Sequence, residues 1–247
     1  MPILLWFKRD LRVHDHAALL RAAAGGAVLP LYIVEPEYWR LADTSTRQWL
    51  FTADCLHSLR QALGELGQPL VVRVGEAVDV LDQLCRTHAI EEMVSHEETG
   101  NGWSYERDLR VRAWARRKAI RWVELSQSAV VRGLKSRDGW AARRNRSMAV
   151  TPLQAPLALP PVAIEPGRIP AALDLGLADD GCTDRQIGGR EQGLRELASF
   201  LNERGRVYRA AMSSPLSGER CCSRLSPYLA SGCVVGAGGG SCPGGKA

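Results

Sequence analysis

The sequence predicts an α/β fold: a Rossmann-like parallel five-stranded sheet with flanking helices, followed by a linker and a fragment of an all-helical domain. Two observations lead to this prediction. Strand-like and helix-like segments alternate up to about residue 125, which is typical of a parallel sheet with right-handed helical crossovers. Beyond residue 150 the chain is rich in proline without a clear period, and helical spacing resumes near residue 189.

The predicted strands are short apolar runs of the kind that a parallel sheet buries on both faces. In chain order they are residues 3–7, 27–34, 70–74, 92–95 and 121–125. Lys8-Arg9-Asp10 follows the first run directly, and Asp15 precedes a helical stretch that starts at Ala17. We therefore expect a charged turn at the carboxyl end of the first strand and a helix capped by Asp15. Ligands of open α/β sheets bind at such strand ends.

Amphipathic segments lie between these strands. They cover residues 45–66, 75–86 and 104–118. In the longest, apolar residues recur at helical spacing and predict one buried face: Trp49, Leu50, Ala53, Leu56, Leu59, Leu63 and Leu66. Cys55 and Cys85 lie in apolar helical patterns and are expected to be buried thiols. Asn101 is expected to cap the third helix.

Composition limits the class of protein. The 247 residues suffice for one full α/β domain and part of another, and 45% hydrophobic residues exclude global disorder. The net charge of +5 suits a polyanionic partner without requiring one. The amino terminus lacks the features of a signal peptide, and no apolar run has membrane-spanning length, so a cytoplasmic location is expected. The seven cysteines match no common zinc pattern, and no metal is predicted.

The proline-rich stretch, residues 151–175, predicts an extended connector on the surface of the parts that it joins. Its apolar side chains are expected to be buried against them: Leu153, Leu157, Leu159, Val162, Ile164 and Ile169. Before it, a stretch from Arg107 to Arg146 is rich in arginine. It could follow a nucleic-acid backbone, but helical spacing scatters its charges around a helix and favours a solvated surface.

Ser223-Arg224-Leu225-Ser226, followed by Pro227, is typical of a loop that enters a helix. Ser226 is predicted to cap that helix and Pro227 to take its first position. Hydroxyl groups beside the free amides of a helix start can also hold a phosphate. From these residues alone, a simple cap remains the alternative.

Two phrases of the chain resemble the photolyase/cryptochrome family. The opening, WFKRDLR followed by His14-Asp15, is very close to the start of that family. The order of Tyr208, Pro215 and the Ser223–Ser226 phrase is similar to the start of its helical FAD-binding domain. The resemblance implies that FAD phosphates contact Tyr208, Ser223, Arg224, Leu225 (through its backbone) and Ser226. Cys222 stands where the family has a threonine, which weakens one contact.

The resemblance also implies a division of the chain. Residues 1–126 would form a photolyase-type α/β antenna domain, 127–187 an interdomain linker, 188–233 the incomplete start of the FAD-binding domain, and 234–247 a low-complexity tail. A folate or deazaflavin antenna in the first domain is then possible. Because most of the flavin domain has no counterpart here, we expect weak FAD binding or none.

The implied function is light-driven electron transfer from reduced FAD, which splits cyclobutane pyrimidine dimers in damaged DNA. We expect this chain to be a catalytically incomplete monomer and name no catalytic residue, since the flavin supplies the chemistry. A cryptochrome-like blue-light sensor and a non-catalytic α/β nucleotide-binding remnant remain as alternatives. The seven tryptophans, all at or before Trp140, are expected to serve core and interdomain packing.

Overall fold

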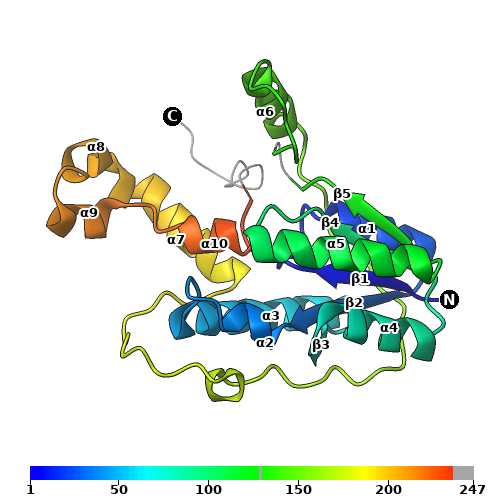
Figure 1. The fold of residues 1–247 in the computed structure, drawn as a ribbon. Helices are drawn as coiled ribbons and strands as arrows, with labels where there is room; N and C mark the ends of the chain where they lie inside the picture. Colours follow the sequence, from blue (N-terminus) through cyan, green and yellow to red (C-terminus); the bar gives the residue numbers. More distant parts are fainter. Residues whose placement is uncertain (128–129, 236–247) are drawn as a thin grey trace.

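A computed structural model describes residues 1–127 and 130–235 (Figure 1). The predicted sheet is confirmed: five parallel strands lie in the order β3-β2-β1-β4-β5. Their bounds lie within a residue or so of the predicted ones: β1 Ile3–Phe7, β2 Val28–Val34, β3 Val71–Val74, β4 Glu92–His96 and β5 Arg121–Leu125. The chain winds from β1 outward to β3 and then returns to place β4 on the other side of β1. The order therefore reverses beside β1, and this reversal leaves a crevice at the carboxyl ends of β1 and β4.

Helices cover both faces of the sheet (Figure 1). They are α1 Ala17–Gly25, α2 Pro36–Trp39, α3 Thr46–Glu65, α4 Ala77–Thr87 and α5 Gly102–Arg117. Leu5 and Phe7 of β1 share one core cluster with α1 and α3, whereas Leu4 and Trp6 share another with α4 and α5. Successive side chains of β1 point to opposite faces of the sheet, so this strand contributes to two separate cores. Burying each large apolar side chain stabilises the fold by about 1.5–3 kcal/mol.

The start of α1 differs from the prediction. The cap is His16, whose Nδ1 accepts a hydrogen bond from the backbone N–H of Leu19 at 2.9 Å. Asp15 adopts a left-handed conformation with φ of 50° and pairs instead with Leu153 of the connector: its N–H donates to the Leu153 carbonyl at 2.8 Å. The prediction that Asp15 caps the helix was wrong because its side chain accepts the Leu153 amide, 138 residues away.

The other helix starts follow the sequence more closely. The Ser45 hydroxyl accepts from the amide of Gln48 before α3, and the Asn101 side chain accepts from the amide of Ser104 before α5. The cap predicted at Asn101 is therefore confirmed. Cys55 and Cys85 are both buried, as predicted.

The connector runs along the outer edge of the sheet, past α3, β3 and α4 (Figure 1). The backbone N–H of Val72 in β3 donates to the carbonyl of Pro166 at 2.7 Å. Gly167, with φ of 72°, lies so close that a Cβ there would be 2.4 Å from the Val72 oxygen. Leu159 and Ile169 are buried as predicted, but Leu157 is 100% exposed, because the connector meets the domain only at intervals.

The arginine-rich α6, Trp140–Met148, projects from the rest of the molecule and has no buried residue. Trp140 is 42% exposed, so the prediction that every tryptophan serves packing was wrong at this position. The short 3-10 turn η1, Ala172–Leu175, follows later in the connector.

The C-terminal part is helical and extends to one side of the sheet (Figure 1). Its elements are α7 Arg190–Asn202, η2 Arg204–Val207, α8 Tyr208–Ala211, α9 Pro215–Cys221 and α10 Ser226–Ala230. Leu225 is the N-cap of α10, and Ser226 already belongs to the helix without a capping bond from its side chain. The prediction of Ser226 as cap and Pro227 as first helical residue was therefore one position late.

Tyr228 of α10 attaches this part to the α/β domain. Its side chain is wholly buried, its ring packs edge-on against Phe51 of α3 at 5.0 Å, and its hydroxyl donates to the carbonyl of Ile187 at 2.7 Å. Of the tail that the sequence predicts to be low-complexity, residues 236–247 lie outside the described part. Within the described part, no helix is both long enough and apolar enough to cross a membrane.

Candidate functional site

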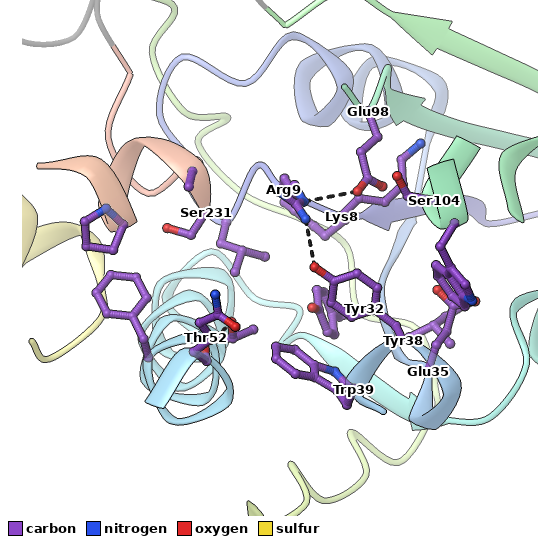
Figure 2. A pocket seen from close by; sticks show the side chains of 18 of the residues that line it. Lys8, Arg9, Tyr32, Glu35, Tyr38, Trp39, Thr52, Glu98, Ser104 and Ser231 are labelled. Carbon is purple, nitrogen blue, oxygen red and sulfur yellow. Dashed lines mark hydrogen bonds and ion pairs between the residues drawn. The ribbon is translucent and has the colours of Figure 1, made fainter. Parts of the chain in front are cut away.

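A cavity of about 420 Å³ opens at the carboxyl ends of β1 and β2, beside the point where the strand order reverses (Figure 2). The end of β1 contributes Lys8 and Arg9, and the end of β2 contributes Glu35. Glu98 follows β4, and Trp103 belongs to the first turn of α5. Residues between the connector and α7, and residues in or directly after α10, also line the cavity: Cys182, Arg185, Gln186, Pro227, Ala230 and Ser231. The helical part therefore helps to form a site whose base is the sheet.

Aromatic rings line much of this cavity. Tyr38 lies between two tryptophans, with ring centroids 5.2 Å from Trp39 and 5.4 Å from Trp103. The guanidinium of Arg107 lies 4.8 Å from the ring centre of Trp6. Flat, apolar walls with a few polar groups suit a planar, conjugated ligand.

A buried ion-pair network lies at one side of the cavity. Arg107 Nη1 donates to Glu35 at 2.8 Å, Nε donates to Asp108 at 3.0 Å, and Nη2 pairs with Glu98. Burial alone would lower the pKa of Arg107, but the three carboxylates outweigh it and raise that pKa. The guanidinium is therefore a fixed positive charge that joins β2, the loop after β4 and α5.

Glu35 differs electrostatically from the other acids of this network. Burial raises its pKa from 4.5 to about 7, and the nearby Glu98 and Glu76 add to that rise against the opposing effect of Arg107. Its Oε1 is buried and has no hydrogen-bond partner among the described residues. The site therefore contains a carboxyl group that gains and loses its proton near neutral pH.

Arg9 lies at the mouth of the cavity. Its Nη2 donates to the Tyr38 hydroxyl at 2.8 Å and its Nε lies 3.2 Å from Glu98 (Figure 2). The Arg9 side chain remains 37% exposed. Arg9 thus links two walls of the site and still offers a cation to a ligand.

Asp10, His16 and His96 form a second buried polar cluster, next to the cavity. Asp10 Oδ2 lies 2.8 Å from His96 Nδ1 and 3.0 Å from His16 Nε2. The remaining ring nitrogens accept amide hydrogens, from Leu19 to His16 and from Ala18 to His96. Three ligand atoms lie close enough to surround a metal ion, but Asp10 lies within 3.0 Å of a nitrogen of each imidazole and backbone amides donate to the other nitrogen of each ring.

The protonation states of Asp10 and His16 agree with a structural role for this cluster. Burial would raise the pKa of Asp10, but hydrogen bonds from His16 and His96 hold it well below its usual range. Burial lowers the pKa of His16 to about 4. An ionised Asp10 beside the neutral imidazole of His16 therefore fastens the turn after β1 to β4 through its contact with His96.

The charged turn predicted after β1 is buried rather than solvated. Lys8, Asp10 and Arg12 are each at most 7% exposed. Lys8 pairs with Asp108 at 3.3 Å, and Arg12 donates to the carbonyl of Gly232 at 3.0 Å. Arg107, placed by the sequence in a solvated stretch, is also buried, and one of its carboxylate partners, Glu35, lies 72 positions away in the chain.

The residues predicted to contact FAD lie apart from this cavity. Tyr208 is 39% exposed and packs edge-on against Phe200 at 5.7 Å. Ser223 accepts from the amide of Leu225 at 3.5 Å, and Arg224 has a left-handed φ of 57°. None of Tyr208, Ser223, Arg224, Leu225 and Ser226 is among the described residues that line the cavity at the sheet.

A second, shallower cavity lies beside Arg224. Its lining is mostly charged: Arg195, Glu196, Ser199, Arg204, Glu219, Arg220 and Arg224. Arg204 pairs with Glu196 at 2.7 Å and also donates to the carbonyl of Cys222. The structure thus connects the segment that leads into Tyr208 with the residue that precedes the Ser223–Ser226 phrase.

Sequence reasoning missed Trp103, Tyr38 and Arg107 as site residues. One signal pointed toward this edge of the sheet without identifying those residues: the polar run at 96–101 follows a predicted strand, and so lies at the carboxyl edge of the sheet. Tyr38 and Trp103 carry no such signal, because an aromatic residue at a helix start is usually part of a core.

Solved structures share this architecture. A bacterial class III photolyase from Agrobacterium tumefaciens aligns with a TM-score of 0.79 and 22% identity, over 96% of this chain and 52% of its own. An archaeal photolyase from Sulfolobus tokodaii, solved with two FAD molecules, aligns with a TM-score of 0.72 and 21% identity, over 97% of this chain and 54% of its own. At these identities, the likeness concerns the fold.

Sequence relatives agree with the fold. Cryptochrome DASH of Gloeobacter violaceus is 30% identical over 256 aligned residues, which cover 94% of this chain and 51% of that protein. A deoxyribodipyrimidine photo-lyase of Salmonella typhimurium is 36% identical over 96 residues, 36% of this chain and 20% of that protein. The chain spans about half the length of the first of these relatives. The DNA photolyase family model matches residues 3–139, more than half of the chain. The chain therefore belongs to the DNA photolyase family.

Proposed function

We propose that this chain supplies the antenna domain of a photolyase-like flavoprotein, and that the cavity at the ends of β1 and β2 binds a planar light-absorbing cofactor, a folate or a deazaflavin. The observation that carries the proposal is the cavity itself. Its volume of about 420 Å³ falls within the range of ligand pockets, roughly 300–1,000 Å³. Tyr38, Trp39 and Trp103 offer flat walls, and Arg9 offers a cation at the mouth.

We further propose that Tyr208 and the residues Ser223, Arg224, Leu225 and Ser226 contact the phosphates of FAD. The shallow cavity beside Arg224 supports this assignment. Within the described part of the chain, Arg220 and Arg224 have no carboxylate partner, so two guanidinium groups are available to a diphosphate. The same cavity is open and polar, which fits the expectation that FAD binds this chain weakly.

For the whole protein we propose light-driven repair of damaged DNA: reduced FAD, when bound, supplies the electron that splits a cyclobutane pyrimidine dimer. The second candidate is a cryptochrome-like blue-light sensor. The similarity to a cryptochrome DASH along 94% of this chain favours keeping it beside the repair enzyme. A cytoplasmic, monomeric protein remains our expectation in both cases.

The cavity is tested with purified chain and two probes, 8-hydroxy-5-deazaflavin and 5,10-methenyltetrahydrofolate. We expect one probe to remain bound after gel filtration and to quench tryptophan fluorescence. Trp103→Leu removes one wall and should weaken binding at least tenfold, which is about 1.4 kcal/mol. Trp140→Leu, on the projecting α6, is the matched control and should leave the affinity unchanged. Failure of both probes to bind the intact chain would remove the antenna proposal.

The flavin and the repair reaction are tested separately. The chain is incubated with FAD, passed through a gel-filtration column and illuminated with thymine-dimer DNA under reducing conditions. A flavin spectrum with light-dependent loss of dimers supports the repair enzyme, and a flavin spectrum without that loss supports the sensor. If the protein shows no flavin absorption after gel filtration, the affinity for FAD is weak, as expected, and the non-catalytic remnant is favoured for this chain.

A further inference from the structure

Two buried thiols meet where the helical part joins the α/β domain. Cys55 belongs to α3 and Cys233 follows α10, 178 positions later, yet their sulfurs lie 3.1 Å apart. Neither side chain is exposed. This separation is shorter than the optimum for two non-bonded carbon atoms, about 3.5–4.0 Å. The two sulfurs are therefore in closer contact than ordinary packing produces.

The backbone on either side of Cys233 is held in place. Leu11 donates to the carbonyl of Ser231 at 3.1 Å, and Arg12 donates to that of Gly232 at 3.0 Å. Arg190 donates to the carbonyl of Cys233 itself at 3.1 Å. Three donors from two different parts of the chain thus fix the position from which Cys233 faces Cys55.

Polar donors also surround the sulfurs. The amide of Gly189 donates to Cys55 Sγ at 3.2 Å, and the Ser231 hydroxyl lies 3.1 Å from Cys233 Sγ. The hydrogen bond with Cys55 lowers the pKa of Cys233, burial opposes it, and Ser231 adds to the lowering. The same shared hydrogen bond, together with burial, raises the pKa of Cys55. The pair is therefore asymmetric, with Cys233 the one that more readily becomes a thiolate.

We propose that Cys55 and Cys233 form a reversible disulfide when the protein meets hydrogen peroxide, and that this bond fastens the segment after α10 to α3. Closing the gap from 3.1 Å to a bond of about 2.05 Å requires a movement of roughly 1 Å. The proposal does not depend on the proposed function.

The reaction balances without a further cofactor. The Cys233 thiolate attacks one peroxide oxygen, so that an S–O bond forms, the O–O bond breaks, and hydroxide leaves and takes a proton to become water. The Cys55 sulfur then attacks the sulfur of the resulting sulfenic acid. The S–S bond forms as the S–O bond breaks, and the proton of the Cys55 thiol leaves with the hydroxide as a second water. Two thiols are oxidised to one disulfide, and one peroxide is reduced by two electrons.

Peptide mapping tests the pairing. The full chain carrying Cys242→Ser is reduced, treated with a tenfold excess of hydrogen peroxide, blocked with iodoacetamide and digested with trypsin without reductant. The replacement leaves Cys233 as the single thiol of tryptic peptide 225–246, while Cys55 is the single thiol of peptide 48–60. We expect these two peptides joined, with a mass two hydrogens below their sum, and separated again by dithiothreitol.

A thermal measurement tests the consequence. The oxidised chain should melt roughly 5–10 °C above the reduced chain, because the cross-link restricts the unfolded state. Cys55→Ser or Cys233→Ser should abolish this shift, while Cys85→Ser, a buried thiol in the other core cluster, should retain it. If peptides 48–60 and 225–246 stay unlinked at a peroxide concentration that oxidises the partly exposed Cys182, the proposal is wrong. A link from Cys233 to any other cysteine would equally overturn it. The peptide map and the comparison of oxidised with reduced chain both keep Cys55 and Cys233, so neither depends on whether a variant at these positions folds.

Discussion

The guanidinium of Arg107 donates to the carboxylate of Glu35 at 2.8 Å and so joins the start of α5 to the end of β2. Both side chains are 7% exposed. The same guanidinium also pairs with Asp108 and Glu98, whose other cationic partners include Lys8 and Arg9 respectively. Among the described residues Glu35 pairs with no other cation, so the centre is sensitive to the loss of Arg107.

Replacing that cation should destabilise the fold strongly. Arg107→Met leaves the buried Glu35 without a cationic partner and removes one of the partners of Glu98 and of Asp108, and we expect the free energy of unfolding to fall by about 3–5 kcal/mol. The matched control is Arg110→Met on the same helix, whose side chain is 46% exposed and lies 3.5 Å from Glu76. It should cost less than about 1 kcal/mol. Urea denaturation of both variants checks the difference, and equal losses would show that the network contributes little.

The raised pKa of Glu35 predicts a pH dependence of stability. The folded chain holds this proton up to about pH 7, whereas the unfolded chain releases it near 4.5. The stabilising contribution is therefore complete below pH 4.5 and is lost as the pH rises through 7. Relative to Glu35→Gln, the wild-type chain should lose up to about 3 kcal/mol between pH 4.5 and 7.5.

Comparing the wild type with Glu35→Gln at each pH isolates this contribution. His16, with a pKa near 4, changes stability in the opposite direction over part of the range, but it is common to both chains. Urea unfolding at several pH values from 5 to 7.5 gives the difference. A difference that does not change with pH would mean that Glu35 is ionised throughout.

Gly232 should tolerate no side chain. Its φ is 70°, and a Cβ there would lie 2.2 Å from the carbonyl oxygen of Arg9. Gly176 has nearly the same φ, 72°, but open space around it, which makes it the matched control. Gly176→Ala should cost about 1–2 kcal/mol from the backbone conformation alone. Gly232→Ala should cost a further 1–3 kcal/mol or so from the contact, as measured by the midpoint of thermal unfolding.

The attachment of the helical part depends on Tyr228. Removing its buried ring with Tyr228→Ala should cost about 3–5 kcal/mol and expose residues 186–235 to protease. Tyr208→Ala is a suitable control, because that ring is 39% exposed. Limited trypsin digestion at 25 °C should release the C-terminal part from the first variant and leave the second unchanged. Equal digestion of both would place the attachment elsewhere.

Much of the α/β domain follows from local sequence. The run at Ile3–Phe7 and the helical spacing around Leu56 predict elements that the structure contains. The spacing of apolar residues follows the geometry of the strand or helix that buries them, so it can be read from local sequence. The caps at Asp15 and Ser226 were wrong because each depends on backbone geometry at a single residue. Asp15 has a positive φ and serves the connector instead, which no local pattern reveals.

The site was less predictable for a different reason. The sequence around Lys8 predicts a charged turn but not its burial, because the partner Asp108 lies 100 positions away. Burial of a charge is decided by such distant partners, so it becomes visible only when the chain is folded. The cavity likewise needs Tyr38, Trp103 and Ser231, which come from three separate stretches of the chain.

The connector has a consequence for solubility. The carbonyl of Pro166 accepts a hydrogen bond from the outward-facing amide of Val72, and Gly167 packs against the carbonyl of Val72. The outermost strand on that side therefore presents little free backbone to a neighbouring molecule, and intermolecular sheet extension is blocked there. Deleting residues 160–168 would leave the backbone of β3 free to pair with a strand of a second molecule, and self-association would rise with concentration.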